Sequence, residues 1–208
     1  MEILRKILKK FGKPQEAEKP QGIHRVAIFG SAEAEQSSPL FEQAFQVAFH
    51  LAKAGYTVID GGGPGVMRAA SLGAQKAGGK VVGVTFYPTD PELYEFEGRD
   101  QNNPIDREIK TDSYVERTLT LMKEGQIYVV FNGASGTMSE FAMAWGLARL
   151  YFGHHRPLIL YGNFWKEIME ALKKNLMLRP VETQVYKIVN TPEKVLEAIK
   201  EFEKEIEV

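Results

Sequence analysis

The sequence predicts an α/β protein: a doubly wound parallel sheet with helices on both faces, in a single domain. Short apolar runs and segments with helical spacing alternate almost throughout the chain, as in sheets of this kind. Two of the apolar runs end in glycine-bearing turns that each open a helix-like segment. A length of 208 residues with 44% apolar residues is enough for one domain with a substantial core.

Each expected strand is a short apolar run bounded by turn residues, and the last of them is weak. In chain order we expect strands at Arg25–Gly30, Tyr56–Asp60, Val81–Phe86, Ile127–Phe131, Pro157–Tyr161 and Val185–Val189.

Between the strands, apolar residues recur with helical spacing. We expect helices at Pro39–Ala54, Pro64–Ala77, Ser113–Lys123, from Gly136 onward, at Asn163–Leu176 and from Thr191 onward. The last of these begins with Thr191-Pro192, an N-cap residue followed by proline at the first helical position.

Two segments do not fit the alternation. Residues 1–11 have the pattern of a basic amphipathic helix. Such a helix can lie on a membrane surface, but we favour packing on its own domain or on a partner subunit, and we expect 13–21 to be a linker. We therefore divide the chain into residues 1–22, helix and linker, and 23–208, the α/β domain. The second segment, Tyr87–Asp112, is expected to be irregular and to form a partial lid, because long loops in compact domains are usually functional.

Composition excludes several classes of protein. A net charge of −1 argues against general binding of nucleic acid. No cysteine is present, which excludes disulfides, thiolate metal sites and cysteine nucleophiles. No apolar run approaches the ~18 residues that span a bilayer, and the first residues lack the pattern of a signal peptide. A cytoplasmic protein without membrane partners is the expectation.

The two glycine turns predict a phosphate site. They read Gly61-Gly62-Gly63-Pro64-Gly65-Val66-Met67 and Gly133-Ala134-Ser135-Gly136-Thr137-Met138-Ser139-Glu140. Such turns leave backbone N–H groups at the positive end of a helix, where phosphate binds. Ligands of doubly wound sheets bind at the carboxyl ends of the strands, where both turns lie. The G-x-G-x-x-G and Walker A motifs are absent, which disfavours hydride transfer and hydrolysis of nucleoside triphosphates.

A few side chains could carry chemistry, and each also has an ordinary structural explanation. Glu140 follows Thr137 at the spacing of a helix capping box, and Arg117 could be a solvated arginine. Ser31 follows the first strand and could contact a ligand or cap the next segment. His154-His155 suits a helix C-terminus, and no carboxylate or further histidine lies at ligand spacing, so no metal site is expected.

The two turns resemble signatures of the LONELY GUY (LOG) family. The first is similar to its G-G-G-P-G-x-M form, and in the second Gly133, Gly136, Thr137 and Glu140 match P-G-G-x-G-T-x-x-E. Arg117 precedes Glu140 by the 23 residues that separate the family's essential arginine and glutamate. The similarity extends from about Val26 to Tyr161.

The resemblance implies a Rossmann-like fold, a homodimer or higher oligomer, and a purine nucleoside 5′-monophosphate as ligand. Well-known members hydrolyse its N-glycosidic bond, in some cases releasing cytokinin bases, without a metal or other cofactor. Arg117 and Glu140 would be catalytic. The phosphate and nucleotide would contact Ser31, Gly61, Gly62, Gly63, Gly65, Met67, Gly133, Ser135, Gly136 and Thr137. Many relatives carry the label lysine decarboxylase, which we reject because nothing here indicates a pyridoxal phosphate lysine.

The chain departs from the family pattern around these residues. The departures are Arg68, Thr118, Asn132, Ala134 and Ser139. They leave two functions open. One is a phosphoribohydrolase, which the retained arginine and glutamate favour. The other is a carrier that binds a nucleotide or the molybdenum cofactor without turnover, which the altered residues favour. A DNA-processing protein is disfavoured by the near-neutral charge.

Overall fold

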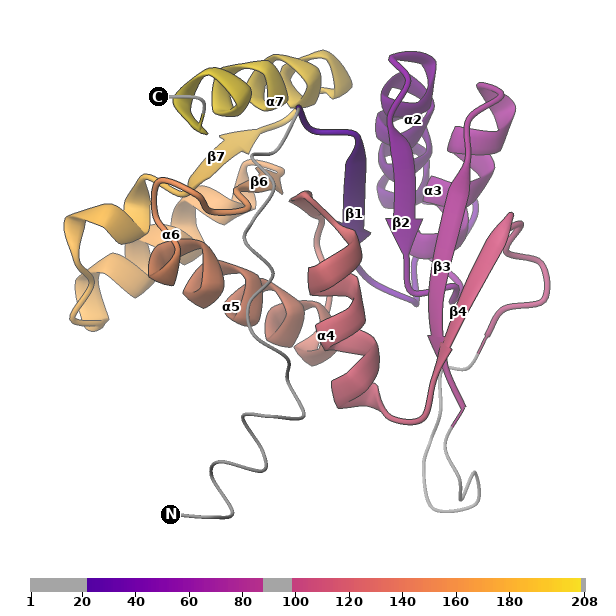
Figure 1. Cartoon of the computed structure of the whole chain (residues 1–208), viewed down its shortest axis with the longest axis horizontal. Coiled ribbons are helices and arrows are strands. Elements are labelled where there is room, and N and C mark those ends of the chain that lie inside the picture. Colours follow the sequence, from indigo (N-terminus) through magenta and orange to yellow (C-terminus); the bar gives the residue numbers. More distant parts are fainter. Residues whose placement is uncertain (1–21, 88–98, 207–208) are drawn as a thin grey trace.

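A seven-stranded sheet with only parallel pairings forms the centre of the computed structural model, which describes residues 22–87 and 99–206 (Figure 1). The strands are β1 (Arg25–Phe29), β2 (Thr57–Asp60), β3 (Val81–Phe86), β4 (Arg107–Thr111), β5 (Ile127–Val130), β6 (Leu158–Tyr161) and β7 (Tyr186–Val189). Their order across the sheet is β4-β3-β2-β1-β5-β6-β7. The order reverses between β1 and β5, which is where ligands bind in doubly wound sheets.

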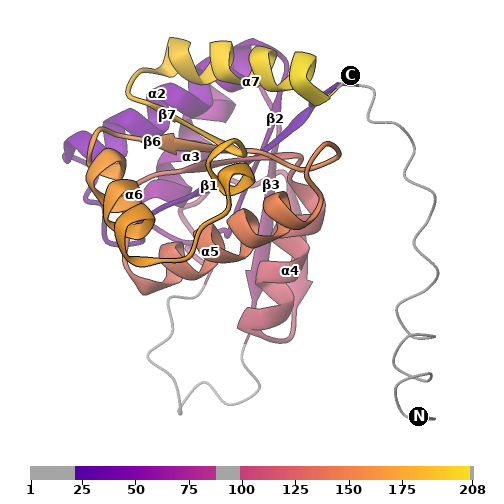
Figure 2. The same ribbon diagram turned by 90° about the vertical axis from the view of Figure 1, so that its left-hand side faces the viewer.

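Six α-helices cover the two faces of this sheet (Figure 2). They are α2 (Pro39–Lys53), α3 (Val66–Lys76), α4 (Tyr114–Glu124), α5 (Ser135–Leu150), α6 (Phe164–Asn175) and α7 (Pro192–Ile206), and a 3₁₀ turn, η2, spans Pro180–Thr183. One apolar core joins α2, α3 and α7 to one face, and a second joins α4, α5 and α6 to the other. The predicted doubly wound α/β class is therefore confirmed.

The predicted elements agree with the structure to within one or two residues at most of their ends. The central strands β1, β2 and β5 consist mainly of fully buried residues, as expected for strands covered on both faces. The N-cap predicted for the last helix is present, since the Thr191 hydroxyl accepts a hydrogen bond of 3.3 Å from the N–H of Lys194.

The prediction of an irregular segment throughout Tyr87–Asp112 was wrong at its end, where Arg107–Thr111 forms the edge strand β4. This strand reads Arg-Glu-Ile-Lys-Thr and has no apolar run, so periodicity could not reveal it. Charged residues are usual on edge strands because they discourage pairing with other chains. Pairing with β3 along its whole length is what makes the segment a strand.

Some predictions fall on residues that the structure does not describe. The amphipathic helix and linker within 1–21 lie outside the described residues, as do positions 88–98 of the predicted lid. Within the described part of the chain, no helix is both long and apolar enough to cross a bilayer.

Candidate functional site

A cavity of about 490 Å³ opens at the carboxyl edge of the sheet, where the strand order reverses. One wall is the segment after β1, and the opposite wall is formed by the first turns of α5. Gly61, Met67 and Phe86 lie along its side, together with Tyr114 and Arg117 of α4. The cavity thus collects residues from five separate segments of the chain.

Eight of the twelve predicted site residues line this cavity. They are Ser31, Gly61, Met67, Arg117, Ser135, Gly136, Thr137 and Glu140. The other four, which are Gly62, Gly63, Gly65 and Gly133, are not among the lining residues. The second glycine turn and the arginine–glutamate pair therefore meet in one place.

The N-terminus of α5 faces the cavity without a side-chain cap. Its N-cap residue, Ala134, has no side chain that can accept a hydrogen bond, and the first turn contains no acidic residue. A methyl group placed on Gly136 would approach only the Tyr114 hydroxyl within 4 Å, at 3.8 Å, so space remains above the first turn. Uncapped N–H groups and the positive end of the helix dipole make this end a favourable place for an anion.

The N-terminus of α3, after the first glycine turn, is engaged within the protein. The N–H of Val66 donates to the carbonyl of Ser31 over 2.9 Å, and the N–H of Gly62 donates to the Asp60 carboxylate over 2.7 Å. Gly65 has φ +62° and packs so closely on the same loop that a Cβ would lie 2.3 Å from the Ser31 carbonyl oxygen. These glycines shape the turn and seat it against the β1 loop.

Arg117 and Glu140 form a buried pair between α4 and α5. Nη2 of Arg117 lies 3.3 Å from Oε1 of Glu140, and the two side chains are only 12% and 9% exposed. The guanidinium carbon also lies 5.0 Å from the ring centre of Tyr114 and 5.5 Å from that of Phe86. The two ring centres are themselves 6.1 Å apart, so both rings pack on the guanidinium from neighbouring directions. The Arg117 Nε is buried without a hydrogen-bond partner among the described residues.

Burial sets the charge state of Glu140. Removal from water raises the pKa of this carboxyl to about 7, and the attraction and hydrogen bond of Arg117 only partly oppose the increase. Near neutral pH the group is therefore poised to accept or to release a proton, which is the condition for general acid–base chemistry.

Tyr114 and Ser139 also belong to the site, although the sequence did not identify them as site residues. The Tyr114 hydroxyl lies 2.5 Å from Oγ of Ser139 and donates to the Gly136 carbonyl at 3.3 Å. Tyr114 thereby joins the start of α4 to the first turn of α5, one turn before Arg117 on the same helix. Its position three residues before Arg117 was the available sequence signal, because residues at this spacing share a helix face.

The departures from the family pattern have different surroundings. Ala134 places its methyl group in the cavity wall. Thr118 is buried within α4, and its hydroxyl donates to the Tyr114 carbonyl at 3.0 Å. Arg68 pairs with Asp100 at 3.2 Å, and the Asn132 carbonyl accepts from the N–H of Ser31 at 2.9 Å. Of these four, only Ala134 lines the cavity.

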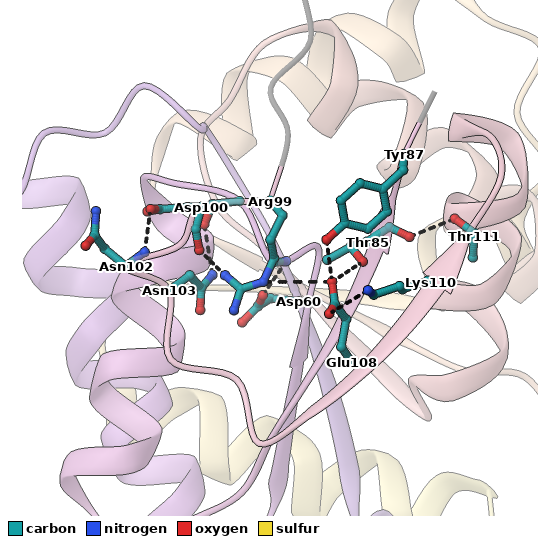
Figure 3. Close-up of polar contacts among 12 residues, drawn as sticks. Asp60, Thr85, Tyr87, Arg99, Asp100, Asn102, Asn103, Glu108, Lys110 and Thr111 are labelled. Carbon is teal, nitrogen blue, oxygen red and sulfur yellow. Dashed lines mark hydrogen bonds and ion pairs between the residues drawn. The ribbon is translucent and has the colours of Figure 1, made fainter. Parts of the chain in front are cut away.

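A polar cluster supports the first glycine turn from the other side (Figure 3). Asp60, at the end of β2, is fully buried and accepts from the Ser71 hydroxyl at 2.7 Å as well as from Gly62. Burial raises its pKa to about 6, against the opposing effect of these hydrogen bonds. Asn103 donates to the Gly63 carbonyl at 2.8 Å. An acid closing a buried apolar strand was the sequence signal for Asp60.

The described residues contain no cluster of three or more histidine, aspartate or glutamate side chains placed to hold a metal ion. His155 is buried with its Nδ1 accepting from the N–H of Gly153 at 3.2 Å.

Comparison with known proteins finds one family and several relatives. The family model described as SLOG cluster4 family matches residues 24–189. An uncharacterized protein of Archaeoglobus fulgidus is 26% identical over 140 residues, which cover 67% of this chain and 85% of that protein. The cytokinin riboside 5′-monophosphate phosphoribohydrolase of Mycobacterium tuberculosis is 28% identical over 148 residues, covering 69% of this chain and 74% of the relative.

Among solved structures, the molybdenum cofactor binding protein of the phototrophic bacterium Rippkaea orientalis is similar, with a TM-score of 0.62. The match covers 88% of this chain and 98% of that protein at 23% identity, a level that indicates a shared fold only.

Proposed function

The chain belongs to the SLOG cluster4 family, and we propose that it binds a nucleoside 5′-monophosphate in the cavity and hydrolyses the N-glycosidic bond. The observation that carries the proposal is the buried Arg117–Glu140 pair, 3.3 Å apart, beside the uncapped N-terminus of α5. A single helix N-terminus suits one phosphate group. The Glu140 carboxylate lies one turn further along the same helix, where the ribose attached to that phosphate would lie.

The chemistry requires cleavage of the bond between the anomeric carbon and the base nitrogen. Positive charge develops on the ribose in an oxocarbenium-like transition state, as in other glycoside hydrolyses. The Glu140 carboxylate stabilises that charge and orients the attacking water, whose oxygen bonds to the anomeric carbon while its proton is released. The bonding electrons leave with the base, which is protonated as free base and ribose 5-phosphate form.

Arg117 has two tasks in this proposal. Its Nη2 keeps the Glu140 carboxylate in place, and its remaining N–H groups are available to an anionic or carbonyl group of the ligand. The rings of Tyr114 and Phe86 pack on the guanidinium and restrict its movement. The phosphate contacts come from Ser135, Gly136 and Thr137, with Ser31 on the opposite wall.

A second candidate function is a carrier that binds a nucleotide-like ligand without turnover. The Ala134 methyl group supports it, because it narrows the cavity at the place where the family's hydrolase signature has glycine. The structural likeness to a molybdenum cofactor binding protein is consistent with such a role on this fold.

The test is a chromatographic time course with AMP, GMP, CMP and a cytokinin riboside monophosphate. Wild type is compared with Glu140→Ala and with a control, Glu197→Ala, which removes an exposed glutamate of α7. We expect free base from wild type and Glu197→Ala, and a loss of at least ~100-fold in Glu140→Ala. Absence of base release, together with a monophosphate-dependent rise in melting temperature, would establish the carrier instead.

A further inference from the structure

Glu108 is a carboxylate outside the cavity that gathers an unusual set of partners (Figure 3). Its Oε1 accepts from the Thr85 hydroxyl at 2.7 Å and from the Tyr87 hydroxyl at 2.9 Å, and it lies 3.9 Å from Nε of Arg99. Oε2 lies 3.9 Å from Nζ of Lys110. Glu108 stands on β4, the strand that the sequence did not predict, and its side chain is 25% exposed.

One set of contacts leads from Glu108 to Phe86. Thr85 and Tyr87 are the two neighbours of Phe86 in the chain, and successive side chains of a strand point to opposite faces of a sheet. Glu108 therefore holds the residues on either side of Phe86 from one face, while the Phe86 ring projects from the other face onto Arg117. The ring centre of Phe86 lies 5.5 Å from the Arg117 guanidinium.

A second set of contacts leads from Glu108 to the first glycine turn. A Cβ placed on Gly62 would meet the Thr85 methyl group at 2.5 Å and Cδ of Arg99 at 3.5 Å, so two of the four partners of Glu108 pack directly on this glycine. The N–H of Asp100, the next residue after Arg99, donates to the Gly62 carbonyl at 3.0 Å.

The glycine turn in turn bears on Arg117. A Cβ placed on Gly61 would lie 3.3 Å from Nη1 of Arg117, so the bare backbone of Gly61 stands directly against the guanidinium. Phe86 and Gly61 are thus two of the surfaces that confine Arg117. Each is next in the chain to a residue held by the partners of Glu108: Phe86 lies between Thr85 and Tyr87, and Gly61 precedes Gly62.

We propose that Glu108 is a positioning residue for the site, which acts through Phe86 and Gly61 to fix the Arg117 guanidinium from the opposite face of the sheet. The inference rests on the proposed function for its catalytic consequence, although the placement of Arg117 is a property of the free protein. Glu108 does not line the cavity. A small displacement of a positioned group is enough to cost up to ~100-fold in rate.

The charge of Glu108 suits this role. Desolvation raises the pKa of its carboxyl, but the hydrogen bonds from Thr85 and Tyr87, with the positive charges of Lys110 and Arg99, outweigh that effect and lower it. The group is therefore ionised at neutral pH, where hydrogen bonds to a carboxylate are stronger than those to a neutral acceptor.

The kinetic test compares Glu108→Leu and Glu108→Gln with Glu124→Leu. Glu124 is a matched control, because its side chain is 23% exposed and also pairs with two basic residues, Arg25 at 3.3 Å and Arg107 at 3.6 Å. We expect Glu108→Leu to lower kcat for AMP by ~10- to 100-fold with a smaller change in KM. Glu108→Gln should restore most of the rate, since its amide oxygen still accepts from Thr85 and Tyr87. A rate in Glu108→Leu equal to that of Glu124→Leu would overturn the inference.

A second measurement does not depend on activity. The ring currents of Phe86 and Tyr114 shift the NMR resonance of the Arg117 Nε–H group, which Arg117→Lys assigns by its disappearance. We expect this resonance to move in Glu108→Leu and to stay in place in Glu124→Leu. Should Glu108→Leu fail to fold, Tyr87→Phe and Thr85→Val each remove one partner hydroxyl and should move it in part. An unchanged resonance in all of these variants would refute the inference, even for a protein that hydrolyses no nucleotide.

Discussion

A buried carboxylate and a buried guanidinium form an ion pair in the lining of the cavity. Glu140 is protonated more readily than an exposed glutamate, because burial outweighs its attraction to Arg117. Arg117 retains an unpartnered Nε among the described residues. An arrangement that leaves polar groups unsatisfied costs stability and is typical of functional sites.

The first prediction concerns the pH dependence that Glu140 confers on stability. Its pKa in the folded protein, about 7, is higher than the ordinary value of 4.5, so the folded state retains a proton that the unfolded chain has lost. The free energy of unfolding should therefore fall as the pH rises from about 4.5 to about 7. Between pH 6 and pH 8 the loss attributable to Glu140 should be about 1 kcal/mol.

Urea denaturation of wild type and Glu140→Gln at a series of pH values measures this effect. Asp60, whose pKa is raised to about 6, adds a similar slope at lower pH in both proteins. The variant should lack the wild-type loss between pH 6 and pH 8, and equal slopes in the two proteins would contradict the assignment.

The two glycine turns place the helices that follow them differently relative to the cavity. Both glycine turns follow central strands and open helices, yet only the α5 turn presents its N-terminus to the cavity. The α3 turn is pressed against the β1 loop through Gly65, and its first N–H is bonded to Ser31. Two turns of similar composition therefore lie differently: the helix end after one faces the cavity, and the helix end after the other packs on the β1 loop.

Two substitutions within the first glycine turn separate its packing role from its contact with the cavity. In Gly65→Ala the new methyl group would lie 2.3 Å from a backbone oxygen at φ +62°, so the free energy of unfolding should fall by more than about 2 kcal/mol. In Gly61→Ala it would meet only the ends of flexible side chains, Sδ of Met67 at 2.8 Å and Nη1 of Arg117 at 3.3 Å. Stability should change little, while AMP binding weakens by roughly 10-fold. Calorimetric titration and urea denaturation of both variants check this, and equal losses of stability would argue against it.

The end of α4 has a cap that comes from far along the chain. Nη1 of Arg156 donates to the carbonyls of Lys123 at 2.7 Å and Gly125 at 2.8 Å, and also to that of Met122. A cation there satisfies the terminal carbonyls and complements the negative end of the helix dipole.

We predict that Arg156→Leu lowers the free energy of unfolding by about 1–2 kcal/mol, because those carbonyls lose their partner. Arg179→Leu, which removes an exposed arginine, serves as the control and should cost less than about 0.5 kcal/mol. Urea denaturation measures both, and a loss of the same size in the two variants would show that Arg156 provides no cap.

At the scale of the whole molecule, large apolar side chains are exposed on α4, on α5 and just after α5. They are Val115 at 62%, Leu119 at 42%, Met138 at 37%, Leu150 at 64%, Tyr151 at 63% and Phe152 at 47% exposure. Exposed apolar residues on neighbouring helices are typical of surfaces that contact another protein. The homodimer or higher oligomer that the family resemblance implies stays a prediction, and this is the surface we assign to it.

Light scattering tests this prediction. We expect a mass of at least twice the 23.4 kDa of the chain, and a mass near 23.4 kDa for the double variant Leu119→Asp, Leu150→Asp. Met177→Asp is the control, because Met177 is fully exposed at 101% and follows α6 instead. A monomeric wild type would contradict the prediction, and a double variant that keeps the wild-type mass would place the interface elsewhere.

The sequence alone determined the α/β class and the alternation of elements, and its family resemblance identified Arg117 and Glu140 as site residues. It could do so because strands buried on both faces are continuous apolar runs and because two motifs carried the family resemblance. For Tyr114 and for the buried Asp60, the sequence held only weak local indications that they lie at or beside the site.

Tertiary structure decided the rest. The edge strand β4 has no apolar run, and only its pairing with β3 defines it. The sequence also treated the two glycine turns alike, whereas packing of Gly65 against the β1 loop engages the N-terminus of α3 and leaves the N-terminus of α5 facing the cavity. Contacts between segments far apart in the chain, such as Glu108 with Arg99 and Thr85, have no signature in local periodicity. They exist only once the sheet brings its strands side by side.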